Sequence, residues 1–207
     1  LTVGAPSVTA KNATVDYLIG EVDVDVTVDG YTVDEAKALP IAVKNGGTDK
    51  EFTATWNADA TKITLAPTAD GKFATARSYD LFVGGVDTTA DITVEAATFT
   101  IKGVDVAEGN KDVNVTLDQA LTDAQASTLR TIMKAQLSNI DVVRNNGSDD
   151  TQHPTSVAVA AGDNGVITLT FSAALNDSGY TKITKVLFDA VSGRYDEFQS
   201  TVEVALK

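Results

Sequence analysis

The sequence predicts an all-β protein made of two tandem β-sandwich domains, and three observations support this fold class. Apolar and polar residues alternate along runs such as Val-Asp-Val-Asp-Val-Thr-Val at 22–28, which is the pattern of a half-buried strand. Similar short runs recur along the chain and are separated by turn-forming pairs such as Asn45-Gly46 and Asn146-Gly147. The second half of the chain repeats the pattern of the first.

The first half contains the signals of an opening strand, five further strands and one short helix. Thr32 and Glu35 have the spacing of a capping box, so a helix is expected to begin there and to end quickly at Pro40. A turn is expected at Asp70-Gly71. An opening strand is expected near residues 7–12, and the β-rich runs predict further strands at 22–28, 52–56, 62–66, 79–83 and 91–95.

The second half contains the same order of signals with a longer helix. Thr122 and Gln125 form a second capping box, and an apolar stripe extends the predicted helix over about 122–137. We expect this helix to cover an open end or edge of the second sandwich. The predicted strands lie at 98–102, 113–117, 140–143, 156–160, 166–171, 183–188 and 200–206.

The two halves align as copies of one unit. The offset between matching residues grows from 89 (Asp25 to Asn114) to 108 (Thr93 to Thr201), as loop insertions in a duplicated domain would produce. Leu81-Phe82 is matched with Leu187-Phe188, Ile41 with Ile140 and Ile63 with Ile167. We therefore expect one domain over residues 1–97 and a second over 98–207. The junction has no Gly/Ser/Pro stretch, which favours a fixed or narrowly hinged angle.

Length and composition exclude several other classes of protein. The 207 residues, 43% of them apolar, are enough to form the cores of two ordinary domains. No run of about 18 apolar residues occurs, so we expect no membrane insertion. The 29 acidic and 16 basic residues give a net charge of −13, which argues against nucleic acid as a partner. Without cysteine there is no disulfide, thiolate metal site or Cys nucleophile.

A family resemblance follows from the order of these elements. Residues 7–12 followed by the alternating run 22–28, and residues 99–106 followed by 113–117, each open a Cys-free, Thr- and Val-rich unit of about a hundred residues. This pattern resembles the immunoglobulin-like (Ig-like) domains of bacterial surface-layer (S-layer) proteins and related cell-surface adhesins. The resemblance implies two tandem Ig-like β-sandwich domains with short helical inserts.

The same resemblance implies a function. The chain is expected to be a secreted, extracellular structural module at the bacterial cell surface or cell wall, which contributes rigid domains to a self-assembling lattice. Its expected partners are neighbouring copies of itself. Surface-layer homology repeats are not seen, so contact with cell-wall polymer is expected only through regions outside this chain. Leu1 opens without a signal peptide, so we expect a mature protein or an excised fragment.

Two alternatives remain open at this stage. One is an adhesin or carbohydrate-binding module, in which loops at one end of a sandwich bind a polymer. The other is an Ig-like decoration or tail domain of a phage particle. An enzyme is not expected: His153, the one histidine, lies in a polar Thr-Gln-His-Pro segment with no matching nucleophile motif.

Calcium is the one expected ligand, and no other cofactor is predicted. The segment 145–150 concentrates oxygen-bearing side chains in what is interpreted as a loop, and such ligands suit calcium. Asn146, Asp149 and Asp150 are the predicted metal ligands. The alternating acids Asp23 and Asp25 are interpreted instead as a solvated strand face, because side chains on one face of a strand lie about 6.5–7 Å apart.

Two aromatic residues carry further predictions. Trp56 shares a strand face with Phe52 and Ala54, so it is predicted to belong to the core rather than to a sugar-binding surface. Tyr79 is a candidate for the tyrosine corner found in β-sandwiches.

Overall fold

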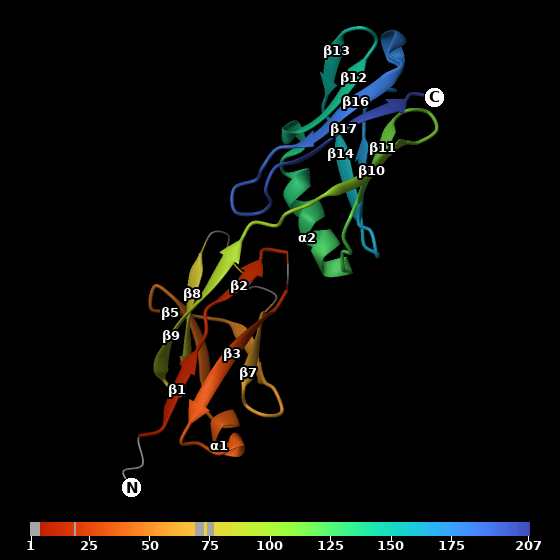
Figure 1. The fold of residues 1–207 in the computed structure, drawn as a ribbon. Helices are drawn as coiled ribbons and strands as arrows, with labels where there is room; N and C mark the ends of the chain where they lie inside the picture. The colour runs from red at the N-terminus through yellow and green to blue at the C-terminus, as the bar shows by residue number, and fades with distance from the viewer. Residues whose placement is uncertain (1–4, 19, 69–72, 74–76) are drawn as a thin grey trace. The chain divides into compact units, whose positions relative to one another are not determined.

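The computed structural model describes residues 5–18, 20–68, 73 and 77–207 (Figure 1). The chain divides into two compact units, unit 1 (Leu1–Ala96) and unit 2 (Ala97–Lys207), and each is an Ig-like β-sandwich. The predicted all-β fold class is thereby confirmed. The turn expected at Asp70-Gly71 lies outside the described residues. Within the described part of the chain, no helix has the length and apolar character needed to cross a membrane.

Unit 1 consists of two sheets with the strand orders β1-β3-β7-β6 and β2-β9-β8-β4-β5. Neighbouring strands are antiparallel except β2 and β9, which run parallel. The helix α1 (Val33–Lys37) connects β3 to β4. The strands are β1 (Ser7–Ala10), β2 (Ala13–Asp16), β3 (Val22–Asp29), β4 (Ile41–Asn45), β5 (Thr48–Lys50), β6 (Phe52–Trp56), β7 (Lys62–Pro67), β8 (Ser78–Val83) and β9 (Val86–Glu95).

Unit 2 repeats this topology, with the strand orders β10-β11-β15-β14 and β13-β12-β16-β17. The helix α2 (Asp123–Lys134) stands where α1 stands in unit 1, and short 3-10 turns occur at Leu137–Asn139 and Asp177–Gly179. No strand in the described residues of unit 2 corresponds to β2. The strands are β10 (Ile101–Val106), β11 (Asp112–Leu117), β12 (Ile140–Asn145), β13 (Asp149–Gln152), β14 (Ser156–Ala160), β15 (Val166–Thr170), β16 (Lys182–Phe188) and β17 (Phe198–Ala205).

Both predicted capping boxes are present. The Thr32 backbone N–H donates to Glu35 Oε2 at 2.8 Å, and the Glu35 N–H donates to Thr32 Oγ1 at 3.3 Å. Thr122 and Gln125 form the same reciprocal pair at 2.8 and 3.3 Å. Both helices therefore begin where the sequence predicts. The second helix ends at Lys134, three residues before the predicted end.

The helix α2 lies against β14, an edge strand of its sheet, as expected from its apolar stripe. It buries Ala126, Leu129 and Met133. These residues follow the i, i+3, i+7 spacing of one helix face, so the helix closes the core beside an edge strand that water would otherwise reach.

The alternating strands deliver their inward side chains to dry cores. In unit 1, Val24, Ile63, Leu65, Leu81 and Ile92 have no exposed surface, and the corresponding layer of unit 2 includes Ile140, Val142, Ile167, Leu169 and Phe188. This two-residue period is what the sequence pattern requires of a strand with one buried face.

The aromatic predictions for unit 1 have different outcomes. Trp56 is half-buried and packs against the core, as predicted. Tyr79 is buried between Phe52 and Phe73, with ring centroids 5.9 and 5.7 Å away. This packing accounts for its burial, and its role as a tyrosine corner stays a prediction.

One predicted match between the two halves is wrong by one residue. Ile41 pairs with Val83 in unit 1, and its counterpart Ile140 pairs with Phe188 in unit 2. Phe188 therefore corresponds to Val83, not to Phe82. Successive strand residues point to opposite faces, so a shift of one residue exchanges inside and outside.

Phe188 belongs to an aromatic cluster in unit 2. The cluster also contains Tyr195, whose buried hydroxyl allows a test of the packing. Phe188 stacks on Phe198 with centroids 4.3 Å apart, and Tyr195 meets Phe198 edge-on at 5.7 Å. Tyr195 is 1% exposed, and its hydroxyl has no hydrogen-bond partner among the described residues. Burial, together with the charge of Asp189, raises the pKa of Tyr195 to about 12.

We expect Tyr195→Phe to stabilise unit 2 by about 1 kcal/mol, because it removes a buried polar group that gains no hydrogen bond on folding. Chemical denaturation followed by circular dichroism measures this change. Tyr31→Phe, at a half-exposed position of unit 1, is the control and should leave stability nearly unchanged. A loss of stability in Tyr195→Phe would show that the hydroxyl has a partner in solution.

Candidate functional site

The segment predicted as a calcium-binding loop is a tight hairpin. Asn145 ends β12 and Asp149 begins β13, so only residues 146–148 form the turn. Asn145 is paired with Asp149, and Arg144 with Asp150, in the antiparallel ladder. The interpretation of 145–150 as an open loop is therefore wrong, because most of its oxygen-bearing side chains project from paired strands.

The three predicted metal ligands each have a local hydrogen-bond partner. Asp149 Oδ1 accepts from Asn145 Nδ2 at 2.6 Å, and Asn146 Oδ1 accepts from the Ser148 backbone N–H at 3.4 Å. Asp150 Oδ2 accepts from Arg144 Nε at 2.7 Å.

The hairpin geometry does not bring these three side chains together. Asp149 and Asp150 are adjacent in a strand and point to opposite faces of the sheet. In the part of the chain that the structure describes, no three His, Asp or Glu side chains are grouped so that they could hold a metal ion. Calcium binding by Asn146, Asp149 and Asp150 stays a prediction.

Arg144 organises this end of unit 2. It is only 8% exposed, and its guanidinium bonds Asp150 at 2.7 Å, Asp177 at 2.5 Å and the Leu175 carbonyl at 3.2 Å. The Tyr180 ring lies below it, 4.1 Å from the guanidinium carbon. One side chain thus connects β12, β13 and the segment that precedes β16.

The electrostatics of this cluster favour the ionised states of Arg144 and Asp150. Burial lowers the pKa of Arg144, but its hydrogen bonds and charge attraction to Asp150 and Asp177 outweigh burial, so the pKa is raised overall. The hydrogen bond from Arg144, with a smaller one from Gln152, lowers the pKa of Asp150. The cluster is therefore a charged crosslink at neutral pH.

The burial of Arg144 could have been predicted from the strand period of the sequence. Ile140, Val142 and Arg144 occupy alternate positions of one strand, so the arginine is placed on the buried face. A buried cation requires anionic partners. Its partners Asp150 and Asp177 come from two different segments of the chain, so the sequence alone does not identify them.

His153 has a partner that the sequence did not reveal. Its Nδ1 lies 3.1 Å from Asp141 Oδ1 and 3.1 Å from the Ile140 carbonyl oxygen. The segment after β13 is thereby tied back to the start of β12. The His153 side chain is half exposed. Its contacts are those of a surface crosslink.

The acidic strand faces are largely paired with neighbouring side chains. Asp23 accepts from Thr64 Oγ1 at 2.7 Å and from Lys62 Nζ at 3.2 Å, and these two bonds lower the pKa of Asp23. In unit 2, Asn114 accepts from Thr168 at 2.8 Å and Asp112 from Thr170 at 2.6 Å. These contacts agree with the interpretation of the alternating acids as a solvated outer face.

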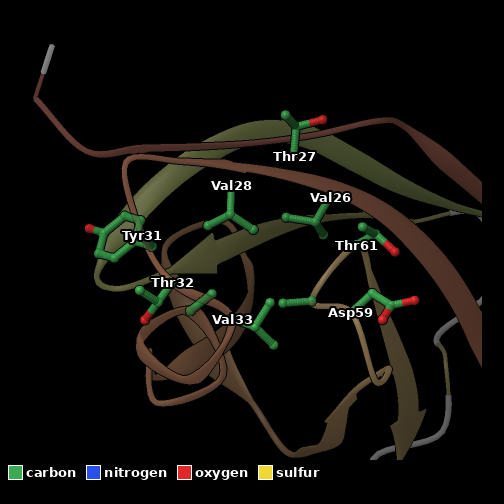
Figure 2. A pocket seen from close by; sticks show the side chains of 10 residues that line it. Val26, Thr27, Val28, Tyr31, Thr32, Val33, Asp59 and Thr61 are labelled. Carbon is green, nitrogen blue, oxygen red and sulfur yellow. The ribbon is translucent and has the colours of Figure 1, made fainter. Parts of the chain in front are cut away.

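A small hollow lies beside α1 in unit 1 (Figure 2). The lining residues are Val26 and Val28 from β3, Tyr31 from the segment between β3 and α1, Val33 at the start of α1, and Asp59 from the turn between β6 and β7. Its volume is about 210 Å³, smaller than the roughly 300–1,000 Å³ of most small-molecule sites. It offers an apolar wall with one carboxylate at the rim.

Comparisons with known proteins give no family assignment. No protein-family model matches the chain, and no curated protein matches it. Among solved structures, a domain tandem from titin is 12% identical with a TM-score of 0.34, and covers 98% of this chain and 66% of its own. Tandem Ig repeats of Dlar are 15% identical with a TM-score of 0.28, over 98% and 97% of the two chains.

A third similar structure is a GBS pullulanase, SAP, in complex with maltotetraose. It is 12% identical with a TM-score of 0.35, over 94% of this chain and 23% of its own. This chain therefore spans less than two thirds of the titin tandem and about a quarter of the pullulanase. Because these similarities are low, the Ig-like fold is assigned from the strand order within each unit and not from any one of the similar structures.

Proposed function

We propose that this chain is an extracellular structural module of a bacterial surface-layer protein, which contributes two rigid Ig-like domains to a self-assembling lattice. The observation that carries the proposal is the repetition of one sandwich topology in both units, each with a dry core. Repeating a stiff module is how a chain builds length and shape. The partners in this proposal are neighbouring copies, and cell-wall polymer is reached through regions outside this chain.

The charge of the chain supplies a means to control assembly. A net charge of −13 per copy makes copies repel one another at low ionic strength. Salt shortens the range of that repulsion to about 8 Å at physiological ionic strength, and calcium would add specific neutralisation. In the proposal, calcium binds Asn146 of the turn and Asp149 at the start of β13, and reaches Asp150 only by competing with Arg144.

Light scattering tests this proposal directly. We expect the weight-average mass to rise with NaCl, and to rise further when CaCl₂ replaces NaCl at equal ionic strength, because a divalent cation neutralises carboxylates more effectively. Asp149→Asn should remove the calcium-specific increment, while Asp163→Asn, at an exposed position elsewhere in unit 2, should retain it. A chain that stays monomeric under all conditions contradicts the lattice proposal. Equal curves for the two salts contradict only the calcium part.

The hollow beside α1 favours the adhesin or carbohydrate-binding module as the second candidate. Tyr31 and the half-exposed Val33 present an apolar surface beside Asp59, a combination that suits a small polar ligand with one apolar face. Titration with wall-derived oligosaccharides tests it: binding that Tyr31→Ala abolishes would favour this candidate over the lattice. The phage alternative has no separate support in the described residues.

A further inference from the structure

The two units differ in how they fill one equivalent space beside their helices. In each unit a threonine caps the helix, and the residue before that threonine is Tyr31 in unit 1 and Leu121 in unit 2. The Leu121 side chain is 6% exposed and lies directly over Gly165, where an added Cβ would stand 2.5 Å from Leu121 Cδ1. The backbone groups of Leu121 also pair with Gly162 at 3.0 and 2.9 Å. Unit 2 therefore closes this space with its own leucine.

The same space in unit 1 is the hollow beside α1, and equivalent backbone hydrogen bonds define the match. The Val26 N–H donates to the Thr61 carbonyl at 2.8 Å. In unit 2 the Leu117 N–H donates to the Gly165 carbonyl, also at 2.8 Å. Thr61 therefore takes the place of Gly165, and its branched side chain leaves no room for a leucine placed like Leu121. The hollow is the part of this space that remains open.

Much of the lining of the hollow is apolar. Figure 2 shows the side chains of Val26 and Val28 directed toward Val33 across the hollow. Ala36 and Ala60, which are 1% and 2% exposed, also line it. An apolar cavity of about 150 Å³ is large enough to bind benzene. The hollow, at about 210 Å³, therefore has room for one aliphatic side chain, which is also what fills the equivalent space in unit 2.

One exposed aliphatic side chain of this chain fits such a hollow. Among the described residues, the large apolar side chains that stand exposed are Val33, which lines the hollow, and Val86, which is 61% exposed. Val86 follows a two-residue turn of Gly84 and Gly85, both with positive φ, which joins β8 to β9. A Cβ added at Gly85 would meet no atom of the described residues within 4 Å, so the tip of this hairpin projects from unit 1.

We propose that the hollow beside α1 binds the Val86 side chain of a second copy of this chain. This inference rests on the proposed self-assembly and assigns a contact to it. Each copy carries one Val86, on the β8–β9 hairpin, and one hollow, lined by β3, α1 and the β6–β7 turn, so the contact can repeat from copy to copy. An exposed valine that enters an apolar pocket of the next molecule produces open-ended assemblies of this kind.

The charges next to this contact make its strength depend on salt. Docking brings Asp87, which follows Val86, toward Asp59 at the rim of the hollow, and both carboxylates are exposed in the single copy. Such like charges repel at low ionic strength, and salt screens the repulsion. At low salt we expect Asp59→Asn to lower the Kd of self-association about threefold. Asp163→Asn, which removes the same charge from an exposed position of unit 2, should leave the Kd nearly unchanged.

Two variants of the full chain test the two sides of the contact. Val33→Asp places a carboxylate in the wall of the hollow, and Val86→Asp places one at the tip of the hairpin. Both positions are exposed, and an acidic residue suits the first turn of a helix, so both variants should melt like the unmodified chain. Each should weaken self-association at moderate salt at least about tenfold in Kd, measured by light scattering. Val86→Ile, which stays apolar, is the matched control and should retain association.

Mixing the two aspartate variants tests whether Val86 meets the hollow. The Val33→Asp chain keeps its Val86, and the Val86→Asp chain keeps its hollow. An equimolar mixture should therefore form pairs that neither variant forms alone. These pairs should not grow beyond two copies, because the hollow and the hairpin that remain free are both defective. A mixture that stays monomeric, although the unmodified chain associates, would show that Val86 does not occupy the hollow.

The outcomes separate this inference from the proposed function. Self-association of the unmodified chain that neither Val33→Asp nor Val86→Asp weakens overturns the assigned contact, while the lattice proposal stands. Wall-derived oligosaccharides that bind the unmodified chain but not Val33→Asp, with self-association equal in both, would assign the hollow to a sugar and overturn the contact. A chain that remains monomeric at every salt and protein concentration contradicts both proposals.

Discussion

Replacing Arg144 with Met is expected to destabilise unit 2 by about 3 kcal/mol, because it leaves Asp150 and Asp177 without their cation. Removing one partner of a fully buried pair costs about 3–5 kcal/mol, and the lower end applies here since both carboxylates are partly exposed. Met retains the length of the aliphatic stem, so the effect reports the lost bonds and not a cavity.

The single tryptophan allows this loss to be assigned to one unit. Trp56 lies in unit 1, so its fluorescence follows the unfolding of unit 1 while far-ultraviolet circular dichroism follows both. In Arg144→Met we expect the midpoint of unit 2 to fall by about 10 °C, with the tryptophan transition unchanged. Lys182→Met, which breaks the exposed pair with Glu203, should cost no more than about 1 kcal/mol. Equal losses in the two variants would mean that Arg144 is not a crosslink.

The stability difference between Arg144→Met and the unmodified chain should depend on pH. Arg144 holds the folded-state pKa of Asp150 below its value in the unfolded chain, which is about 3.9 for Asp. A carboxyl with a lowered folded pKa adds stability above the unfolded pKa and loses it as the pH falls through the folded pKa. The difference in free energy of unfolding between Arg144→Met and the unmodified chain should therefore be constant near neutral pH and become smaller below about pH 4.

The features that the sequence predicts correctly are those encoded locally. The alternation at 22–28 places Val22, Val24 and Val26 on the buried face, and both Thr-x-x-Glu/Gln capping boxes mark the observed helix starts. In each case the residues that interact are neighbours along the chain or repeat with the strand period. Local chemistry was sufficient to derive them.

The features that the sequence does not give depend on pairing between distant segments. Asp177 lies 33 residues from Arg144, and the ion pair exists because β16 returns beside β12. The position of β17 as an edge strand is a property of the sheet as a whole, since no strand in the described residues of unit 2 corresponds to β2. The predicted calcium ligands diverge for the same reason: the ladder, not the local composition, decides where Asp149 and Asp150 point.

The largest expected loss of stability follows from the one-residue shift between the two copies, by which Phe188 corresponds to Val83. Phe188→Ala should destabilise unit 2 by about 4 kcal/mol, because it removes a fully buried ring that stacks on Phe198 at 4.3 Å. Phe82, which direct alignment of the two halves matches to Phe188, is half-exposed, with Lys44 Nζ 4.4 Å from its ring centroid. Phe82→Ala should cost only about 1 kcal/mol.

The preceding leucines should show the reverse order. Leu81 is fully buried and Leu187 is only half-buried, so Leu81→Ala should cost about 3 kcal/mol and Leu187→Ala about 1 kcal/mol. Denaturant midpoints of the four variants, read by tryptophan fluorescence for unit 1 and by circular dichroism for unit 2, test the whole set. Large losses at both phenylalanines would restore the direct alignment. A crossed pattern, with the large losses at Leu81 and Phe188, would establish that the two copies differ by one residue between β4 and β8, since only such a shift reverses which neighbour enters the core.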